Sequence, residues 1–426
     1  MTDLRSPGTL SELAKATLNS ILQRGEATRK VIATDVGISF PTVTNVIGEL
    51  EALSLVREVR REQGARGRAT LVYGVSEKAG WVLAVDVGST QVRYVARGLD
   101  GSTRASRVER VERLDGFEPA RRAASMTAEL LQQVHDAGPL LSVAIGINQV
   151  VPKSFVAREP TSDPRLTHDI VAVFMGGAGI PHEVPVLVEN NVNCAAVAEH
   201  EDGMMQGLDD CAYMQIGVGI GLGYFSDGVL IRGGSGASGE LAQIPVSWSA
   251  DVASPRDLIE HTYGSGGLLA AARAAWPGAD LPESTEEVFA RAEEGNDVAR
   301  SIMRTHAVAL ARIAATAATI IDPSVLVLGG GLSRSLRFVE LIADEFASRT
   351  ARTQLRASSK GTAATVEGAV ILARDLALSR MLGSRHRALL GRPAIWGEWA
   401  RDADGPGTSD TTTETERAAA AGGGDG

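Results

Sequence analysis

The sequence contains few of the residues that would link the chain covalently or hold it in a membrane. Its two cysteines, Cys194 and Cys211, exclude a framework of several disulfides and a cysteine-rich zinc site. The longest apolar stretch, at about Ala314–Leu328, is interrupted by Asp322 and Pro323 and is too broken to span a bilayer. No apolar run follows the N-terminus, so we expect no signal peptide, no membrane partner and a cytoplasmic location.

Aromatic residues are also scarce, at 4% of the chain, and alanine and glycine take their place. The hydrophobic fraction of 44% is ordinary for a folded protein, and 426 residues are enough for two or three domains that each bury a core. The net charge of −10 is unevenly distributed, because residues 1–80 carry 11 lysines and arginines against 9 acidic residues. This asymmetry indicates that the N-terminal region has a different kind of partner.

Helical signals dominate the start of the chain. Leucines and an isoleucine recur at near-helical spacing up to Gly25, which predicts a first helix. A second short helix fits Thr28–Val36 and ends at Gly37, and a third runs from its N-cap Ser39 to about Leu53. Helix, short helix, tight turn and third helix are the plan of a helix-turn-helix, whose last helix enters the major groove of DNA.

Two strand-like runs, Ser54–Val59 and Ala69–Val75, follow the third helix. The turn between them is rich in arginine and glycine, so the pair predicts a β-hairpin wing whose tip contacts phosphates or a narrow minor groove. We expect operator DNA to contact the start of the third helix and this tip: Ser39, Thr42, Thr44, Asn45, Arg66 and Arg68. The alternative is a unit that serves dimerisation only, with the arginine-rich turn as a solvated loop. The third helix offers threonine and asparagine rather than arginine, lysine or glutamine, so we expect affinity to rest mainly on the wing and on phosphate contacts.

Three polar residues end an apolar strand in the middle of the chain. The run Val186–Val188 is followed by Glu189, Asn190 and Asn191, and an alanine-rich helix begins there. Polar groups at the end of a strand in an open α/β sheet lie where such folds bind ligands. The segment resembles a signature of the ROK family, the sugar kinases and sugar-responsive repressors of the wider actin-like ATPase fold.

The resemblance implies that a catalytic position has changed. In the kinases the strand ends Glu-Asn-Asp-Ala-Asn, and the aspartate takes the proton of the sugar hydroxyl. Asn191 occupies that position here. A carboxamide cannot take a proton near neutral pH, whereas a positioned base typically contributes about 10²–10⁴ in rate. We therefore expect that the chain is not an enzyme.

Glycine-rich segments follow in the order of the family's nucleotide-binding loops. A buried strand ends in an Asp-x-Gly-x-Thr turn, Gln215–Gly223 carries glycine at every second position, and a later strand ends in three glycines. Val218 replaces the threonine that contacts phosphate in the family, so the resemblance implies a vestigial nucleotide site and no cofactor. Its residues would be Asp86, Gly88, Thr90, Gly217, Gly219 and Gly330. The alternatives are that the Asp-x-Gly-x-Thr segment is a plain β-turn and that the glycines of Gln215–Gly223 only permit close packing of the sheet.

The segment Ile231–Gln243 resembles the Gly-Glu-Ile-Gly-His segment with which the family binds sugar hydroxyls. Glu240 matches, and Gln243 replaces the histidine. The cysteines that bind zinc in ROK proteins are missing after this segment, and His261 alone cannot build a tetrahedral site, so we expect no metal. Glu260 matches the last glutamate of that zinc motif. The resemblance thus implies effector contacts by Asn190, Asn191, Glu240, Gln243 and Glu260.

These predictions describe an α/β protein of three parts. Residues 1–79 form a winged helix-turn-helix, residues 80–383 form a two-lobed, actin-like ROK domain, and residues 384–426 form a low-complexity tail that we expect to be largely disordered. The resemblance implies a repressor, a homodimer or homotetramer, in which a sugar or sugar-derived effector biases closure of the lobes and changes the spacing of the DNA-binding heads. Two alternatives remain: an ATP-dependent sugar kinase with an appended DNA-binding head, and a scaffold without DNA affinity.

Overall fold

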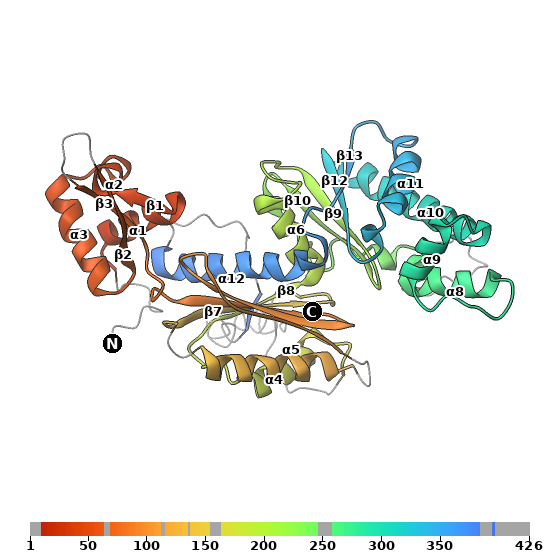
Figure 1. Ribbon diagram of the computed structural model, residues 1–426, viewed down its shortest axis with the longest axis horizontal. Coiled ribbons are helices and arrows are strands. Elements are labelled where there is room, and N and C mark those ends of the chain that lie inside the picture. Colours follow the sequence, from red (N-terminus) through yellow and green to blue (C-terminus); the bar gives the residue numbers. More distant parts are fainter. Residues whose placement is uncertain are drawn as a thin grey trace, which may run out of the picture.

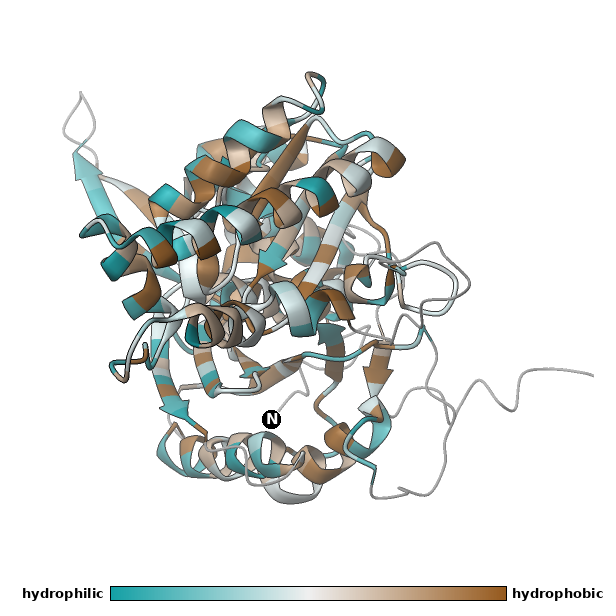
Figure 2. Cartoon of the chain, turned by 90° about the vertical axis from the view of Figure 1, so that its right-hand side faces the viewer, coloured by the Kyte–Doolittle hydropathy of each residue, from teal (hydrophilic) through white to brown (hydrophobic). Residues whose placement is uncertain are grey.

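The computed structural model describes residues 10–63, 69–111, 116–134, 137–153, 163–245, 258–383 and 394–396. Over these residues the chain forms sheets of three, six and five strands (Figure 1). The three-stranded sheet belongs to an N-terminal unit at one end of the molecule, and each of the other two sheets forms the centre of a larger lobe. Hydrophobic strands lie inside these lobes, while the helices on the outside carry hydrophilic stretches (Figure 2).

Three helices make up most of the N-terminal unit: α1 (Glu12–Arg24), α2 (Arg29–Val36) and α3 (Phe40–Ala52). Each begins after a hydroxyl side chain that accepts a hydrogen bond from a backbone N–H of the first turn: Ser11, Thr28 and Ser39. Gly37, with φ of 71°, ends α2, and the chain bends by 106° before α3 begins. No single helix in the described part of the chain is long and apolar enough to cross a membrane, and α2 and α3 pass that test only as this bent pair.

A small antiparallel sheet completes the N-terminal unit in the order β1 (Glu26–Thr28), β3 (Ala69–Val75) and β2 (Val56–Gln63). β2 and β3 lie where the sequence predicts the two strands of a hairpin. The turn that joins them, which contains Arg66 and Arg68, lies outside the described residues. β1 was not predicted, because three residues between two helices are too few to show an alternating pattern.

The six-stranded sheet of the first lobe has parallel strands at its centre. Its order is β14 (Ala394–Trp396), β8 (Val186–Asn190), β7 (Leu140–Ile147), β4 (Trp81–Val87), β5 (Gln91–Gly98) and β6 (Thr103–Arg110). Every residue of β7 is buried, because α12 (Ala364–Leu382) covers one face of the sheet and α4 (Glu118–Gln133) and α5 (Thr167–Ala178) cover the other (Figure 1). The carboxyl ends of β4, β7 and β8 meet at one edge, where such sheets bind ligands.

The strand β14 corrects the predicted boundary of the tail. We assigned residues 384–426 to a low-complexity tail, but Ala394–Trp396 pairs antiparallel with β8 and extends the sheet at its edge. Ala394 is buried, and the Trp396 ring lies against His168 with the ring centroids 5.2 Å apart. This strand therefore belongs to the first lobe. Its pairing partner is too distant in the sequence for composition to reveal it.

The second lobe is built on the five-stranded sheet, in the order β11 (Val229–Leu230), β10 (Ile220–Ser226), β9 (Cys211–Ile216), β12 (Val325–Gly329) and β13 (Gln354–Ala357). The helices of this lobe are α7 (Leu258–Tyr263), α8 (Ser265–Ala275), α9 (Thr285–Glu293), α10 (Asp297–Ile321) and α11 (Leu336–Ala347). Buried side chains of α10 and α11 join those of the central strands in one hydrophobic cluster. The second lobe therefore has a core of its own.

The helix α6 (Asn191–Asp202) contacts both lobes. It packs against α12 of the first lobe and against β9 and β10 of the second. The residues Val192–His200 are all buried, so most of this helix has no face toward solvent. Gly368 of α12 crosses it so closely that a β-carbon there would lie 1.7 Å from the carbonyl oxygen of Cys194. Small residues on both helices thus fix the position of α6 and of the polar residues at its start.

Candidate functional site

Asn190 at the end of β8 caps α6. Its side-chain oxygen accepts hydrogen bonds from the backbone N–H groups of Val192, at 2.8 Å, and Asn193, at 3.3 Å. Its amide nitrogen donates to the carbonyl oxygen of Gln149, 3.1 Å away. Asn190 therefore has a structural role in starting the helix, which our assignment of this residue to effector contacts did not include.

Asn191 is the first residue of α6 and is only half-buried. Its carbonyl oxygen accepts a hydrogen bond from the Thr365 hydroxyl of α12, at 3.3 Å. Its side-chain amide has no hydrogen-bond partner within the described residues. Of the two asparagines, Asn191 is therefore the one with polar atoms left for a ligand, and these atoms can donate or accept a hydrogen bond but cannot take a proton near neutral pH.

A buried ion pair joins the two lobes next to these asparagines. Glu189 of β8 is 1% exposed, and its Oε2 accepts a hydrogen bond from Nε of Arg232, which follows β11, at 2.7 Å. The Arg232 side chain is 9% exposed. Oε1 of Glu189 accepts from the backbone N–H of Asn190, at 3.0 Å, and from the Asn193 amide, at 2.9 Å. Because both of its oxygen atoms are engaged, Glu189 does not replace the missing base at position 191.

The segment that follows Arg232 approaches the first lobe a second time. Gly236 has φ of 88°, and a β-carbon there would lie 1.9 Å from the carbonyl oxygen of Val151 in the first lobe. Glu240 follows and is half-buried, while Gln243, at the end of a short 3-10 helix beside β10 and α7, is exposed. The amide of Gln243 is therefore open to solvent. The close approach of Gly236 to Val151 and the ion pair of Arg232 with Glu189 hold the segment that follows Arg232 against the first lobe.

Three of the predicted nucleotide-binding glycines and Glu260 lie together in the second lobe. The turn after β9 is closed by a hydrogen bond from Gly217 N–H to the Gly219 carbonyl, at 3.1 Å. A β-carbon on Gly219 would lie 3.3 Å from Oε2 of Glu260 in α7. Gly330, with φ of 92°, follows β12, and a β-carbon there would lie 2.5 Å from the backbone of β9. Its positive φ and this close approach require glycine at position 330 whether or not a nucleotide binds there.

The other predicted nucleotide-site residues lie in the first lobe. Asp86 is near the end of β4, Gly88 is in the turn that follows, and Thr90 is exposed. Burial raises the pKa of Asp86 to about 7, although the guanidinium of Arg93, opposite in the register of β5, lowers it. The raised pKa shows that the folded chain without a bound cation disfavours the ionised form of this carboxyl.

The donor atoms do not fit the metals of the resembled family. No group of three or more histidine, cysteine, aspartate or glutamate side chains within the described ranges could hold a metal ion. Val218, 46% exposed on the glycine turn, brings no hydroxyl to a phosphate. The glycine turn therefore lacks one phosphate contact of the resembled family.

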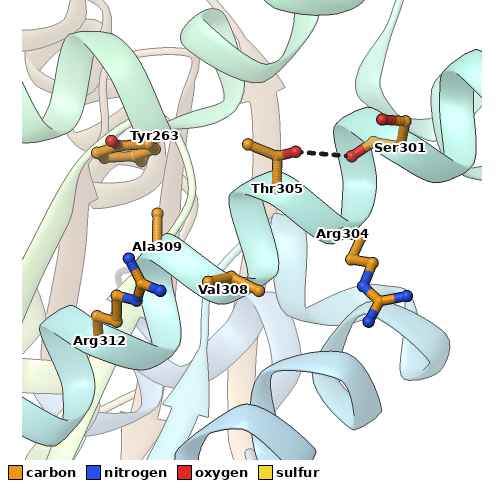
Figure 3. A pocket seen from close by; sticks show the side chains of 7 residues that line it. All are labelled: Tyr263, Ser301, Arg304, Thr305, Val308, Ala309 and Arg312. Carbon is orange, nitrogen blue, oxygen red and sulfur yellow. Dashed lines mark hydrogen bonds between the residues drawn. The ribbon is translucent and has the colours of Figure 1, made fainter.

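Two hollows lie away from the junction of the lobes. One, of about 390 Å³, lies along α10, where Figure 3 shows Arg304 and Arg312 on either side of Val308 and the ring of Tyr263 nearby. The other, of about 410 Å³, lies between β5, β6 and the start of α12. Neither hollow is lined by a predicted effector residue.

The start of α3 divides the predicted DNA contacts into engaged and free groups. The hydroxyls of Ser39 and Thr42 are hydrogen-bonded to each other at 2.7 Å, and Thr44 donates to the Phe40 carbonyl oxygen at 3.1 Å. Asn45 is exposed, and its amide has no partner among the residues that the structure describes. Phe40, which we did not select from the sequence, is 55% exposed on the same helix.

Comparisons with known proteins identify the larger part of the chain. The family model described as "ROK family" matches residues 82–376, which is more than half of the sequence. The chain belongs to the ROK family. The resemblance to this family, stated above from the motifs, is thereby confirmed.

Relatives within the family include both repressors and kinases. The chain is 24% identical over 240 residues to the xylose repressor of Bacillus subtilis. The aligned region covers 55% of this chain and 60% of the repressor. It is 29% identical over 175 residues to the beta-glucoside kinase of Listeria innocua. This aligned region covers 39% of this chain and 56% of the kinase. The matches thus span less than two thirds of the length of these relatives.

A solved structure has the same fold over most of the chain. It is a ROK family transcriptional regulator, a homologue of the E. coli MLC protein, with a TM-score of 0.65 and 20% sequence identity over 87% of this chain and 96% of that chain. An identity of 20% establishes a shared fold and not a shared activity. The mixed α/β, two-lobed architecture is therefore that of the ROK family.

Proposed function

We propose that this ROK protein is a DNA-binding transcriptional repressor that senses a sugar and does not phosphorylate it. The N-terminal unit carries this proposal. α2 and α3 are joined by a short turn that contains Gly37, and the bend of 106° between them falls within the range of about 90–120° of helix-turn-helix motifs. The strands β2 and β3 add the arms of a wing. Phosphorylation of a sugar would need no such unit.

The effector site that we propose lies where the end of β8 meets the second lobe. The unpartnered amide of Asn191 and the exposed amide of Gln243 offer donors and acceptors for hydroxyl groups, and Glu240 and Glu260 lie on neighbouring segments. A sugar or sugar-derived compound suits this set of amides and carboxylates. A relative is a xylose repressor, so pentoses belong with hexoses among the candidates.

α12 supplies a physical connection between this site and the DNA-binding unit. Its Thr365 is hydrogen-bonded to the carbonyl oxygen of Asn191, and it contacts both α6 and α1. The buried residues of α1 and of the C-terminal half of α12 belong to one hydrophobic cluster. Movement of α6 on effector binding would thus shift the DNA-binding unit, and in a homodimer or homotetramer it would change the spacing of two such units.

The competing proposal is an ATP-dependent sugar kinase with a DNA-binding head. It draws support from the kinases among the relatives. Against it stand the amide at Asn191, the engaged carboxylate of Glu189 and the raised pKa of Asp86. A kinase would convert ATP and a sugar into a sugar phosphate, and Asp86→Ala would abolish that turnover.

Selection of DNA sites from a random-sequence library tests the proposed function. We expect one enriched sequence with a Kd at least about 10³-fold below that for unrelated DNA at physiological salt. Asn45→Ala should raise the Kd for the selected site by about tenfold, because the free Asn45 amide can form a pair of hydrogen bonds with a base edge. Gel shift with wild-type and variant chains measures both values.

The control is Gln206→Ala, an exposed amide in the turn after α6 that donates a hydrogen bond to the Glu201 carbonyl oxygen, at 3.1 Å. It should leave the Kd unchanged. A chain that enriches no sequence, or an Asn45→Ala variant that binds as tightly as the wild type, would contradict the assignment of α3 as the recognition helix.

A further inference from the structure

Phe40 is an exposed aromatic side chain at the first position of α3. Its exposure is 55%, and the other large hydrophobic residues exposed in the described part of the chain are aliphatic. The ring has apolar area left to bury, and it lies at the start of the second helix of the helix-turn-helix, where recognition helices contact base edges. The buried face of α3 is formed by other residues: Val43, Val46, Ile47 and Leu50.

The side chains around Phe40 leave few other groups for recognition. Ser39 and Thr42 are hydrogen-bonded to each other, and the Thr44 hydroxyl donates to the carbonyl oxygen of Phe40 itself. The first turn of α3 contains no acidic residue, so nothing there repels a phosphate backbone, and the helix N-terminus favours a negative partner. The surface at the start of α3 therefore presents a phenyl ring and, five residues further and about 140° around the helix axis, the Asn45 amide.

We propose that Phe40 determines sequence specificity by contacting the C5-methyl group of a thymine in the major groove. This inference rests on the proposed DNA-binding function. The N-terminal residues of a recognition helix contact base edges. Thymine presents a methyl group there that cytosine lacks, and a phenyl ring is one of the groups that makes apolar contact with it. Asn45 would read a neighbouring base through hydrogen bonds.

Replacement of thymine by deoxyuridine removes only the methyl group and isolates this contact. In the selected site, each thymine is replaced in turn, and the Kd is measured for the wild type, Phe40→Ala and Phe40→Leu. A single deoxyuridine at the contacted thymine should weaken wild-type binding about three- to fivefold, the effect of losing one buried methyl group. Phe40→Ala should bind both forms equally, and Phe40→Leu should keep part of the difference.

Val229→Ala serves as the control, because Val229 is also exposed, at 43%, but lies in the second lobe. It should respond to deoxyuridine as the wild type does. If every deoxyuridine affects wild-type and Phe40→Ala chains equally, or if Phe40→Ala changes only the oligomeric state in sedimentation, the inference is wrong while the proposed function stands. A wild-type chain that selects no sequence contradicts both.

Discussion

Arg232→Ala is expected to lower the free energy of unfolding by about 3–5 kcal/mol. The Glu189 carboxylate, 1% exposed and 2.7 Å from the guanidinium Nε, would remain buried without its counter-ion. Removal of one partner of a buried pair leaves an uncompensated charge, which destabilises far more than the loss of the attraction itself. Urea unfolding of the wild type and the variant measures the difference.

A double variant separates the buried charge from the loss of packing. Glu189→Gln combined with Arg232→Met removes both charges and keeps similar volumes, so it should recover most of the lost stability. Arg337→Ala is the matched control, since Arg337 and Glu340 form an exposed pair, with side chains 59% and 61% exposed, and should change stability by less than about 1 kcal/mol. If Arg232→Ala were as mild as Arg337→Ala, the ion pair would not hold the lobes together.

Asp86→Asn is expected to stabilise the protein at pH 8 by roughly 2–4 kcal/mol and to change it little at pH 4. Burial raises the pKa of Asp86 from 3.8 to about 7 in the folded chain. Below pH 4 the carboxyl is protonated in both states. As the pH rises to about 7, ionisation of Asp86 lowers the free energy of the unfolded chain but not that of the folded chain. The free energy of unfolding of the wild type therefore falls over this pH range. Asparagine removes that loss.

Urea unfolding of both chains at pH 4, 6 and 8 measures this effect. The two stability curves should diverge between pH 4 and pH 7 and run parallel above it. Curves that stay parallel throughout would mean that Asp86 is ionised in the folded chain at neutral pH. It would then be a competent ligand for Mg²⁺, which would favour the kinase alternative.

Features with a local signal were predictable from the sequence. The Ser39 cap and the glycine at position 37 set the limits of α3 and α2, and the polar break after Val188 marks the end of β8 and the start of α6. The identity of residue 191 likewise needs no structure. In each of these cases the residues that determine the feature are neighbours in the chain.

Features that depend on distant partners were not predictable. β1 and β14 are three-residue strands that exist because β3 and β8 offer hydrogen bonds, and Arg232 pairs with Glu189 from 43 residues away. Asn190 was assigned to effector contacts, yet its side-chain oxygen caps α6 and its amide nitrogen donates to the Gln149 carbonyl oxygen. Phe40 was missed because its apolar side chain resembles a core residue until its exposure is known.

The most direct test is the effect of sugar on DNA affinity without ATP. The sugar is one that raises the unfolding temperature of the chain in a thermal-shift screen of pentoses and hexoses. Fluorescence anisotropy then gives the Kd for the selected DNA site with and without it. We predict that the sugar changes this Kd by at least about fivefold in the absence of ATP, and that it does not change the Kd of the Asn191→Ala variant. A sugar that acts only when ATP is present, while a sugar phosphate accumulates, would contradict this prediction.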